Sequence, residues 1–415
     1  MSQYQHKTNC RLCGSKSLKL AVPMKPSPIG DAFVSAERLN EEQPLFPLNC
    51  YLCDDCGHLQ NLDVVNPDIL FRDYTYRTSA SLGLVEHFRK YADELSRDLG
   101  LSKDDLIVEI GSNDGSLLKA FKSRGMRVQG IDPAVEIAIQ ACNDGIPTTP
   151  EFFTSAISEK IRSELGPAKL FCANNVFAHI DNMSDVVKGI RTILDDDGVF
   201  VFEVSYIIDM VDNMVFDTIY HEHVSHHALI PLDRFFRSLD MSMFDVKRMH
   251  TKGGSIRCFA QPLSTGKRRI SDNLSKFMAD EKRRGFLNFP VYNEWHQTII
   301  AKKNNLLSVI DKEISAGKRI AAYGASTTTT TLIYNFELEN RIEFIVDDNS
   351  IKQGKYSPRA HIPVLHPNAL IEMKPEVVII LAWTYEEPII KRNSGYLLNG
   401  GTFIVPLPEI KIIRQ

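Results

Sequence analysis

Tyr220, His221, Glu222 and His223 place four ionisable side chains next to one another in the second half of the chain. A histidine imidazole titrates near ~6.5, so it can take up or return a proton at neutral pH. Together with a phenol and a carboxylate, two imidazoles can deprotonate a carbon acid and stabilise the resulting anion. A solvated histidine-rich loop would contain the same residues. The position of this group in the fold therefore decides between a catalytic site and a solvent-exposed loop.

The group follows a predicted buried strand at 198–205, in a domain whose first loop is rich in glycine. An apolar strand at 106–110 leads into that loop, and a helix follows it. A second strand at 127–131 ends at Asp132, 21 residues beyond Gly111. This spacing suits a carboxylate that holds a ribose diol. Either a dinucleotide or S-adenosylmethionine could use such a layout.

The chemistry of the loop favours S-adenosylmethionine. The loop lacks G-x-G-x-x-G and carries Glu109 and Asp114 at its edges, and carboxylates repel phosphate but attract a cationic amino-acid ligand. Two predicted strands at 244–249 and 255–261 form a terminal antiparallel hairpin, which a purely parallel dinucleotide fold would not need. A glycine turn that serves packing alone is the alternative. The expected cofactor contacts are Glu109, Gly111, Asn113, Asp114, Gly115, Asp132 and Asn174.

His179 follows a predicted strand at 169–174. Ligands of open α/β sheets bind at the carboxyl ends of strands, so His179 and the group at 220–223 can face one crevice. A packed histidine is an equally good interpretation of His179. Tyr74 and Tyr76 lie where the N-terminal region joins the middle domain, and either could donate a hydrogen bond to a substrate or simply pack there.

Two C-x-x-C-G units lie near the N-terminus, separated by 39 residues. Four thiolates from two such knuckles suit tetrahedral zinc, and each glycine permits the turn behind the metal. With all four positions filled by sulfur, the site is expected to be structural; paired buried thiols without metal are the alternative. Cys50 is close in sequence but lacks the trailing glycine. The predicted ligands are Cys10, Cys13, Cys53 and Cys56.

The overall composition is that of a multidomain globular protein. The 415 residues predict two or three domains, with 43% hydrophobic and 24% charged residues. A net charge of −4 without a basic stripe argues against nucleic acid as a partner. The sequence has no apolar run of membrane-spanning length, and its polar first residues lack a signal-peptide core. We expect a cytoplasmic protein, either a monomer or a weak homodimer.

The C-terminal region predicts a second α/β unit. A long helix is expected at 286–316, followed by strand-like runs at 319–323, 342–346, 377–382 and 402–405. The first run ends in Gly324, Ala325 and Ser326, with threonines from Thr327, and small hydroxylated residues that enter a helix can cradle phosphate. Asp347 takes the position of a ribose-binding carboxylate. The threonines could equally pack the start of the helix.

The order of these parts resembles the sugar C-methyltransferase family, which acts on nucleotide-linked 4-keto sugars. The resemblance spans nearly the whole chain. It rests on the C-x-x-C-G pair, the loop at 109–115, the group at 220–223 with Val224 and Ser225, His250 with the glycines at 253–254, and the stretch 352–356.

The resemblance implies an α/β protein of three domains. They are a zinc-binding domain at 1–72, a class I, Rossmann-like S-adenosylmethionine domain at 73–262, and a second Rossmann-like domain at 263–415 that holds the substrate nucleotide. It places the catalytic base on His223, with Tyr220, Glu222, His179 and Tyr76 around the sugar. Substrate contacts are expected from His221, Gly324, Ser326, Thr327, Asp347, Lys352 and Tyr356.

The implied reaction methylates a ring carbon, most simply C3, beside the ketone of a nucleotide-linked 4-keto-6-deoxy sugar through an enolate. One departure is visible: the family commonly has Lys-Gly-Asn-Thr after Gly-Ala, where this chain has Ser326 and a threonine run. The identity of the nucleotide therefore stays open. The alternatives are an O- or N-methyltransferase on a nucleotide sugar, a non-catalytic zinc scaffold, and a nicotinamide-dependent oxidoreductase.

Overall fold

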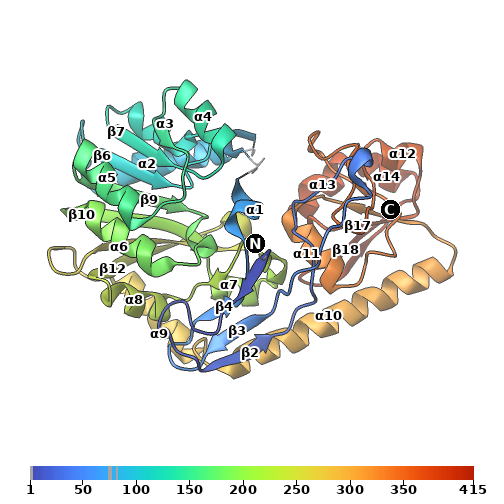
Figure 1. Cartoon of the computed structure of the whole chain (residues 1–415). Helices are drawn as coiled ribbons and strands as arrows, with labels where there is room; N and C mark the ends of the chain where they lie inside the picture. The colour runs from blue at the N-terminus through green and yellow to red at the C-terminus, as the bar shows by residue number, and fades with distance from the viewer. Residues whose placement is uncertain (1–2, 73–76, 81–82) are drawn as a thin grey trace.

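The computed structural model describes residues 3–72, 77–80 and 83–415. Three larger sheets and one two-stranded ribbon make up its β-structure. Figure 1 shows two α/β units side by side, with the N-terminal strands below and between them and one long helix along the base.

A seven-stranded sheet forms the core of the first α/β unit, in the order β12-β13-β10-β9-β6-β7-β8. The five strands from β10 to β8 are parallel, and β13 and β12 are added antiparallel at one edge. This edge confirms the predicted hairpin. The strands are β6 (Leu106–Ile110), β7 (Arg127–Ile131), β8 (Thr148–Thr149), β9 (Ala168–Asn174), β10 (Leu194–Ser205), β12 (Met241–Met249) and β13 (Ser255–Pro262).

Helices cover both faces of this sheet because its strands are apolar on both sides. Ile107 and Leu170 contribute to a cluster with α2 and α3, whereas Val108 and Phe171 contribute to the cluster that includes α5 and α6. Successive side chains of a strand point to opposite faces, which explains this division. The helices of this unit are α2 (Leu84–Asp98), α3 (Ser116–Lys122), α4 (Val135–Asn143), α5 (Ser155–Leu165), α6 (Met183–Ile193), α7 (Ile207–Asp212) and α8 (Leu229–Arg237).

The N-terminal region builds a four-stranded antiparallel sheet in the order β11-β4-β3-β2. Its edge strand β11 (Ser225–His226) comes from the first α/β unit and begins two residues after His223. A separate ribbon pairs β1 with β5. The other elements of this region are β1 (Tyr4–His6), β2 (Leu18–Val22), β3 (Cys50–Cys53), β4 (Leu59–Asn61), β5 (Asp63–Val65), the 3₁₀ turn η1 (Ala36–Arg38) and α1 (Pro67–Phe71).

The C-terminal unit has a six-stranded sheet in the order β16-β15-β14-β17-β18-β19. Five strands are parallel and only β19 is antiparallel. The four strand-like runs are confirmed as β14, β15, β17 and β18, whereas β16 and β19 were not predicted. The elements are β14 (Ile320–Tyr323), β15 (Ile345–Val346), β16 (Val364–Leu365), β17 (Val377–Ile380), β18 (Thr402–Val405), β19 (Lys411–Ile413), α11 (Thr327–Asn335), α12 (Ala369–Glu372), α13 (Glu386–Arg392) and α14 (Ser394–Leu398).

Two helices connect the units. The first, α9 (Asp272–Arg283), packs against α8 and β12 of the first unit. The second, α10 (Phe289–Ser315), runs along the base of the molecule below the N-terminal sheet and reaches the C-terminal unit (Figure 1). The predicted helix at 286–316 is therefore confirmed with slightly shorter ends. The domain limits at 72/73 and 262/263 remain a proposal.

Every helix among the residues that the structure describes is too short or too polar to span a lipid bilayer.

Candidate active site

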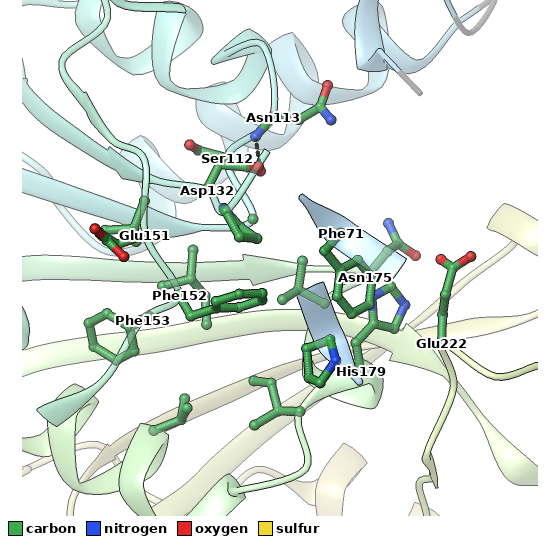
Figure 2. A pocket seen from close by; sticks show the side chains of 18 of the residues that line it. Phe71, Ser112, Asn113, Asp132, Glu151, Phe152, Phe153, Asn175, His179 and Glu222 are labelled. Carbon is green, nitrogen blue, oxygen red and sulfur yellow. Dashed lines mark hydrogen bonds between the residues drawn. The ribbon is translucent and has the colours of Figure 1, made fainter. Parts of the chain in front are cut away.

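A cavity of about 590 Å³ opens at the carboxyl ends of β6, β7 and β9. It joins the glycine loop after β6 to the group after β10. Figure 2 shows Asn113 and Asp132 at one end of it and Glu222 toward the other, with the rings of Phe71 and Phe152 between. The predicted site residues that line it are Glu109, Gly111, Asn113, Asp132, Asn174, His179, Tyr220, Glu222 and His223.

The loop after β6 is drawn tightly against its neighbours. Gly111 has a left-handed φ of +60°, and a Cβ there would lie 2.1 Å from Cγ2 of Val176. Asp132, just beyond β7, accepts hydrogen bonds from the backbone N–H groups of Asn113 (2.8 Å) and Ala134 (2.9 Å). A non-glycine side chain at 111 would displace a wall of the cavity.

Two buried polar groups on this side of the cavity are incompletely satisfied. Glu109 accepts a hydrogen bond from the amide of Asn174 at 3.4 Å. Among the residues that the structure describes, the other carboxylate oxygen of Glu109 and the amide oxygen of Asn174 have no hydrogen-bond partner. Burial, reinforced by the charges of Asp132 and Asp114, raises the pKa of Glu109 well above its usual value. Such oxygens suit a cationic group that enters the cavity.

Asp114 and Gly115 are not among the described residues that line the cavity. Asp114 accepts hydrogen bonds from the backbone of Ser79 (2.8 Å) and the hydroxyl of Ser116 (2.6 Å). It therefore fixes the start of α3 and the segment at 77–80. Gly115 precedes α3 with φ +72°.

The base candidate His223 has a defined tautomer. Its Nδ1 lies 2.7 Å from the carbonyl oxygen of Thr218, and since a carbonyl only accepts, Nδ1 carries the hydrogen. In the neutral imidazole Nε2 then has the lone pair, and the hydroxyl of Tyr220 donates to it at 3.0 Å. Burial, followed by the charges of Glu222 and Asp217, raises the pKa of Tyr220 well above its usual value, so the phenol stays protonated.

Aromatic rings surround His223. The ring of Tyr220 stacks on it with centroids 4.0 Å apart, and the ring of His179 lies at 5.0 Å. Phe71 of α1 stacks on His179 at 5.6 Å. The structure thus brings together the residues predicted at the ends of β9 and β10, whereas Tyr74 and Tyr76 lie outside the described residues.

His221 and Asp217 point elsewhere. Nε2 of His221 donates to the carbonyl of Phe46 at 3.3 Å, and burial lowers the pKa of His221 to about 4. Asp217 accepts a hydrogen bond from the indole of Trp383 at 2.8 Å, and burial raises the pKa of Asp217 to about 7. These two residues connect the group at 220–223 to the N-terminal and C-terminal regions.

The predicted C-terminal contacts form a second group, away from the cavity that His223 lines. Asp347 accepts from the backbone of Ala325 at 2.6 Å, and Lys352 pairs with Asp31 of the N-terminal region. Tyr356 forms a backbone bridge with Val34. The remaining members are Gly324, Ser326 and Thr327, at the start of α11.

The four predicted metal ligands come together. The sulfur atoms of Cys10, Cys13, Cys53 and Cys56 all lie within 4.8 Å of one another, with Cys10–Cys56 and Cys13–Cys53 at 3.6 Å. Zinc–sulfur bonds of about 2.3 Å in a tetrahedron imply sulfur separations of about 3.8 Å. The cluster therefore fits zinc. Cys50 lies apart, 3.5 Å from a ring nitrogen of His226.

Part of the cavity wall was missed in the sequence. The end of α1 contributes Phe71, and its C-cap residue Arg72 places the guanidinium 4.8 Å from the ring centre of Phe152. Phe152 follows the short strand β8, so the rule that ligands bind at carboxyl ends of parallel strands could have indicated it. No comparable signal marks α1, because a five-residue helix has little periodicity.

Three protein-family profiles match successive parts of the chain. Residues 10–71 match a "putative zinc binding domain", residues 85–239 a "methyltransferase domain", and residues 250–408 a "C-methyltransferase C-terminal domain". The C-methyltransferase NovU of Streptomyces niveus is 33% identical over 405 residues, which cover 97% of this chain and 96% of that protein.

Solved structures resemble part of the chain. Magnesium protoporphyrin IX methyltransferase from Synechocystis PCC 6803, with bound SAM, has a TM-score of 0.33 at 13% identity and covers 43% of this chain and 79% of its own. An S-adenosylmethionine-dependent methyltransferase from Clostridium acetobutylicum has a TM-score of 0.35 at 12% identity and covers 44% and 92%.

Proposed function

Because the chain belongs to the family of zinc-containing C-methyltransferases, we propose that it methylates a ring carbon of a nucleotide-linked 4-keto-6-deoxy sugar. The protein is an S-adenosylmethionine-dependent methyltransferase. Our proposal adds three points to this activity: a sugar substrate, methylation at C3 beside the ketone, and a route through an enolate. One observation supports the enolate route: the candidate base His223 lines the same cavity as the loop after β6 and Asp132.

The residues after β6 and β9 fit the cofactor. When bound, S-adenosylmethionine supplies an electrophilic methyl group on a sulfonium. The unsatisfied oxygens of Glu109 and Asn174 suit a cationic amino-acid portion, and Asp132 suits the ribose diol. Among the described lining residues, Phe152 offers an apolar ring in the same cavity as Asp132, against which the adenine ring could pack (Figure 2).

His223 supplies the base. A C–H bond becomes acidic enough for removal only when a neighbouring carbonyl delocalises the charge, which is why the substrate is a ketone. Thr218 holds Nδ1–H, so Nε2 is the nitrogen that takes the proton from the ring carbon. The electron pair of the broken C–H bond passes to the enolate and would then form the new C–C bond as the methyl–sulfur bond breaks. The electron pair of that methyl–sulfur bond would stay on the sulfur, and S-adenosylhomocysteine would leave. The imidazolium later returns its proton to solvent.

Tyr220 and Glu222 support this step. In the free protein the hydroxyl of Tyr220 donates to Nε2 of His223, and turning that hydroxyl to the ketone oxygen would free the base and stabilise the enolate. Tyr76 is the second candidate for that donor. Glu222 lines the cavity next to His223 and would stabilise the imidazolium. The ring of His179 lies 5.0 Å from the ring of His223.

The decisive variant is His223→Ala. Without the imidazole we expect at least a ~100-fold loss of turnover, since general base catalysis contributes about 10²–10⁴-fold. The affinity for S-adenosylhomocysteine, measured by calorimetry, should stay within about twofold of wild type. A near-normal rate in a variant that binds the cofactor normally would assign the base to another residue.

Carbon-13 NMR of the product decides the atom that is methylated. A labelled methyl group should appear bonded to a ring carbon of a 4-keto nucleotide sugar. A signal at the shift of an O-methyl or N-methyl group would favour the alternative methyltransferases. Cofactor binding without turnover on dTDP-, GDP-, UDP- and CDP-linked 4-keto sugars would favour a non-catalytic scaffold.

A further inference from the structure

Arg11 lies between Cys10 and Cys13 in the sequence, and its guanidinium forms its hydrogen bonds with residues outside the cysteine cluster. The side chain is only 3% exposed. Its guanidinium donates to the Asp181 carboxylate (3.2 Å), the Val224 carbonyl (2.9 Å), the Asn61 carbonyl (3.0 Å) and the Gln60 side-chain oxygen (3.1 Å). One side chain thus contacts three separate segments of the chain.

Two of these partners adjoin the histidines of the cavity. Val224 is the residue after His223, and Asp181 is the second residue after His179. The backbone N–H of Val224 also donates to the carbonyl of Ala178 at 3.0 Å. The segments that carry the two histidines therefore contact each other directly, and both contact Arg11.

The other two partners belong to the N-terminal sheet. Gln60 and Asn61 lie in β4, which pairs with β11 immediately after Val224. The backbone N–H of Asn61 donates to the same Val224 carbonyl at 3.0 Å. Arg11 thus reinforces the junction where the zinc-binding region meets the segment of His223.

Lysine cannot replace these contacts. The guanidinium is planar and offers several donors in a fixed fork, whereas an ammonium is a point charge that would leave buried acceptors unsatisfied. A buried acceptor that is left without a donor destabilises the folded arrangement. Reacting groups are also sensitive to position, since a displacement of about 1 Å can lower a rate about 100-fold.

We propose that Arg11 is a positioning residue for methyl transfer, whose guanidinium holds the segments of His179 and His223 in register with the zinc-binding region. The proposal rests on the function proposed above, because it gives His223 a role in the reaction. Since Cys10 and Cys13 flank Arg11, the metal cluster anchors the backbone from which this side chain extends.

The test compares Arg11→Met and Arg11→Lys with Lys7→Met. The ammonium of Lys7 lies 2.8 Å from the other oxygen of Asp181. Among the residues that the structure describes, Lys7 makes no hydrogen bond to Val224, so Lys7→Met removes only a charge partner of the same carboxylate. The measurements are zinc content, affinity for S-adenosylhomocysteine, kcat with the accepted 4-keto nucleotide sugar, and nitrogen-15 NMR of the histidine rings.

We expect zinc content to be unchanged and cofactor affinity to stay within about threefold in all three variants. Both Arg11 variants should lower kcat by about 10- to 100-fold and shift the ring signals of His179 and His223. Lys7→Met should keep kcat within about twofold. A folded Arg11 variant with unshifted ring signals, or with normal kcat, overturns the proposal.

Two further results separate this proposal from the function on which it rests. If Arg11→Met fails to fold, Arg11→Lys decides, and failure of both makes Arg11 a folding determinant and overturns the positioning role. If the wild-type protein methylates no 4-keto nucleotide sugar, the proposed function fails. The NMR comparison would still support or overturn the placement of the two histidine segments.

Discussion

The loop after β6 and the loop after β14 have the same backbone arrangement. In each, a glycine N–H donates at 2.8 Å to the last carbonyl of the next strand, from Gly111 to Ile131 and from Gly324 to Val346. In each, a carboxylate one residue beyond that strand accepts a backbone N–H of the loop, as Asp132 and Asp347 do. Both units thus place an acidic residue where nucleotide-binding folds hold a ribose.

The two loops differ in how their polar groups are satisfied. The loop after β6 leaves oxygens of Glu109 and Asn174 without a hydrogen-bond partner among the described residues, and it lines a large cavity. The helix after the other loop starts with a capping box, in which Ser326 and Thr329 bond each other's backbone N–H groups. Thr330 also donates to the carbonyl of Gly30 in the N-terminal region. A shared topology therefore indicates where a ligand can bind. Buried polar groups without a hydrogen-bond partner indicate, in addition, that a bound ligand would complete the hydrogen bonds of the site.

We expect the largest effect when Asp132 and Asp347 are each replaced by alanine in separate variants. Asp132→Ala should weaken S-adenosylhomocysteine binding by about 100-fold, because a charged acceptor for two hydroxyls is worth about 3 kcal/mol. Asp347→Ala should leave the affinity for S-adenosylhomocysteine unchanged and lower the affinity for the nucleotide sugar instead. Isothermal titration with each ligand checks both effects. An equal loss of affinity for both ligands in either variant would show that the two loops do not bind different ligands.

Alanine at the two glycines should give a smaller effect. A Cβ at Gly324 would lie 2.7 Å from Cβ of Ala382, and its φ of +112° disfavours other residues. Gly111→Ala and Gly324→Ala should each lower the free energy of unfolding by about 1–3 kcal/mol. Only Gly111→Ala should also lower the affinity for S-adenosylhomocysteine, by about tenfold, because Val176 must shift into the cavity. Thermal unfolding and titration together measure this, and a cofactor defect in Gly324→Ala would contradict it.

The smallest expected difference between the two loops is in the number of protons that are released or taken up when each ligand binds. Burial holds the pKa of Glu109 well above its usual value, so a bound cation that favours the carboxylate should release up to about one proton. Affinity for S-adenosylmethionine should then rise with pH until the free carboxyl ionises. Burial also raises the pKa of Asp347, but a bound phosphate would favour its neutral form and take up a proton.

Calorimetry in buffers of different ionisation enthalpy measures the sign for each ligand. Glu109→Gln is the control that should remove proton release on cofactor binding. Release of the same sign with both ligands would show that the loops do not differ in the charge that they accept.

Local sequence patterns were sufficient for the parts whose signals are close together in the chain. The C-x-x-C-G spacing predicted the cluster of Cys10, Cys13, Cys53 and Cys56, and the two glycines at 253–254 predicted the hairpin of β12 and β13. The loop after β6 was found for the same reason, since its strand, glycines and helix are contiguous. Whether the predicted site residues act as assigned stays a prediction.

The features that were missed depend on contacts between distant residues. The strand β11 has two residues, and only its pairing with β4, about 165 positions away, defines it. The hydrogen bond from Trp383 to Asp217 spans 166 positions. The strands β16 and β19 are likewise short, and their apolar residues have no periodicity of their own. Arg11 resembles any solvated arginine in sequence, and only the folded chain buries it.

The long helix α10 sets the spacing of the two α/β units. It has 27 residues and therefore spans about 40 Å as a rigid rod that lies against β2. Each residue added within it would swing everything downstream through about 100° around the rod's axis and push it outward by about 1.5 Å. Insertions and deletions within this helix should consequently be tolerated only near whole pairs of turns, about seven residues at a time.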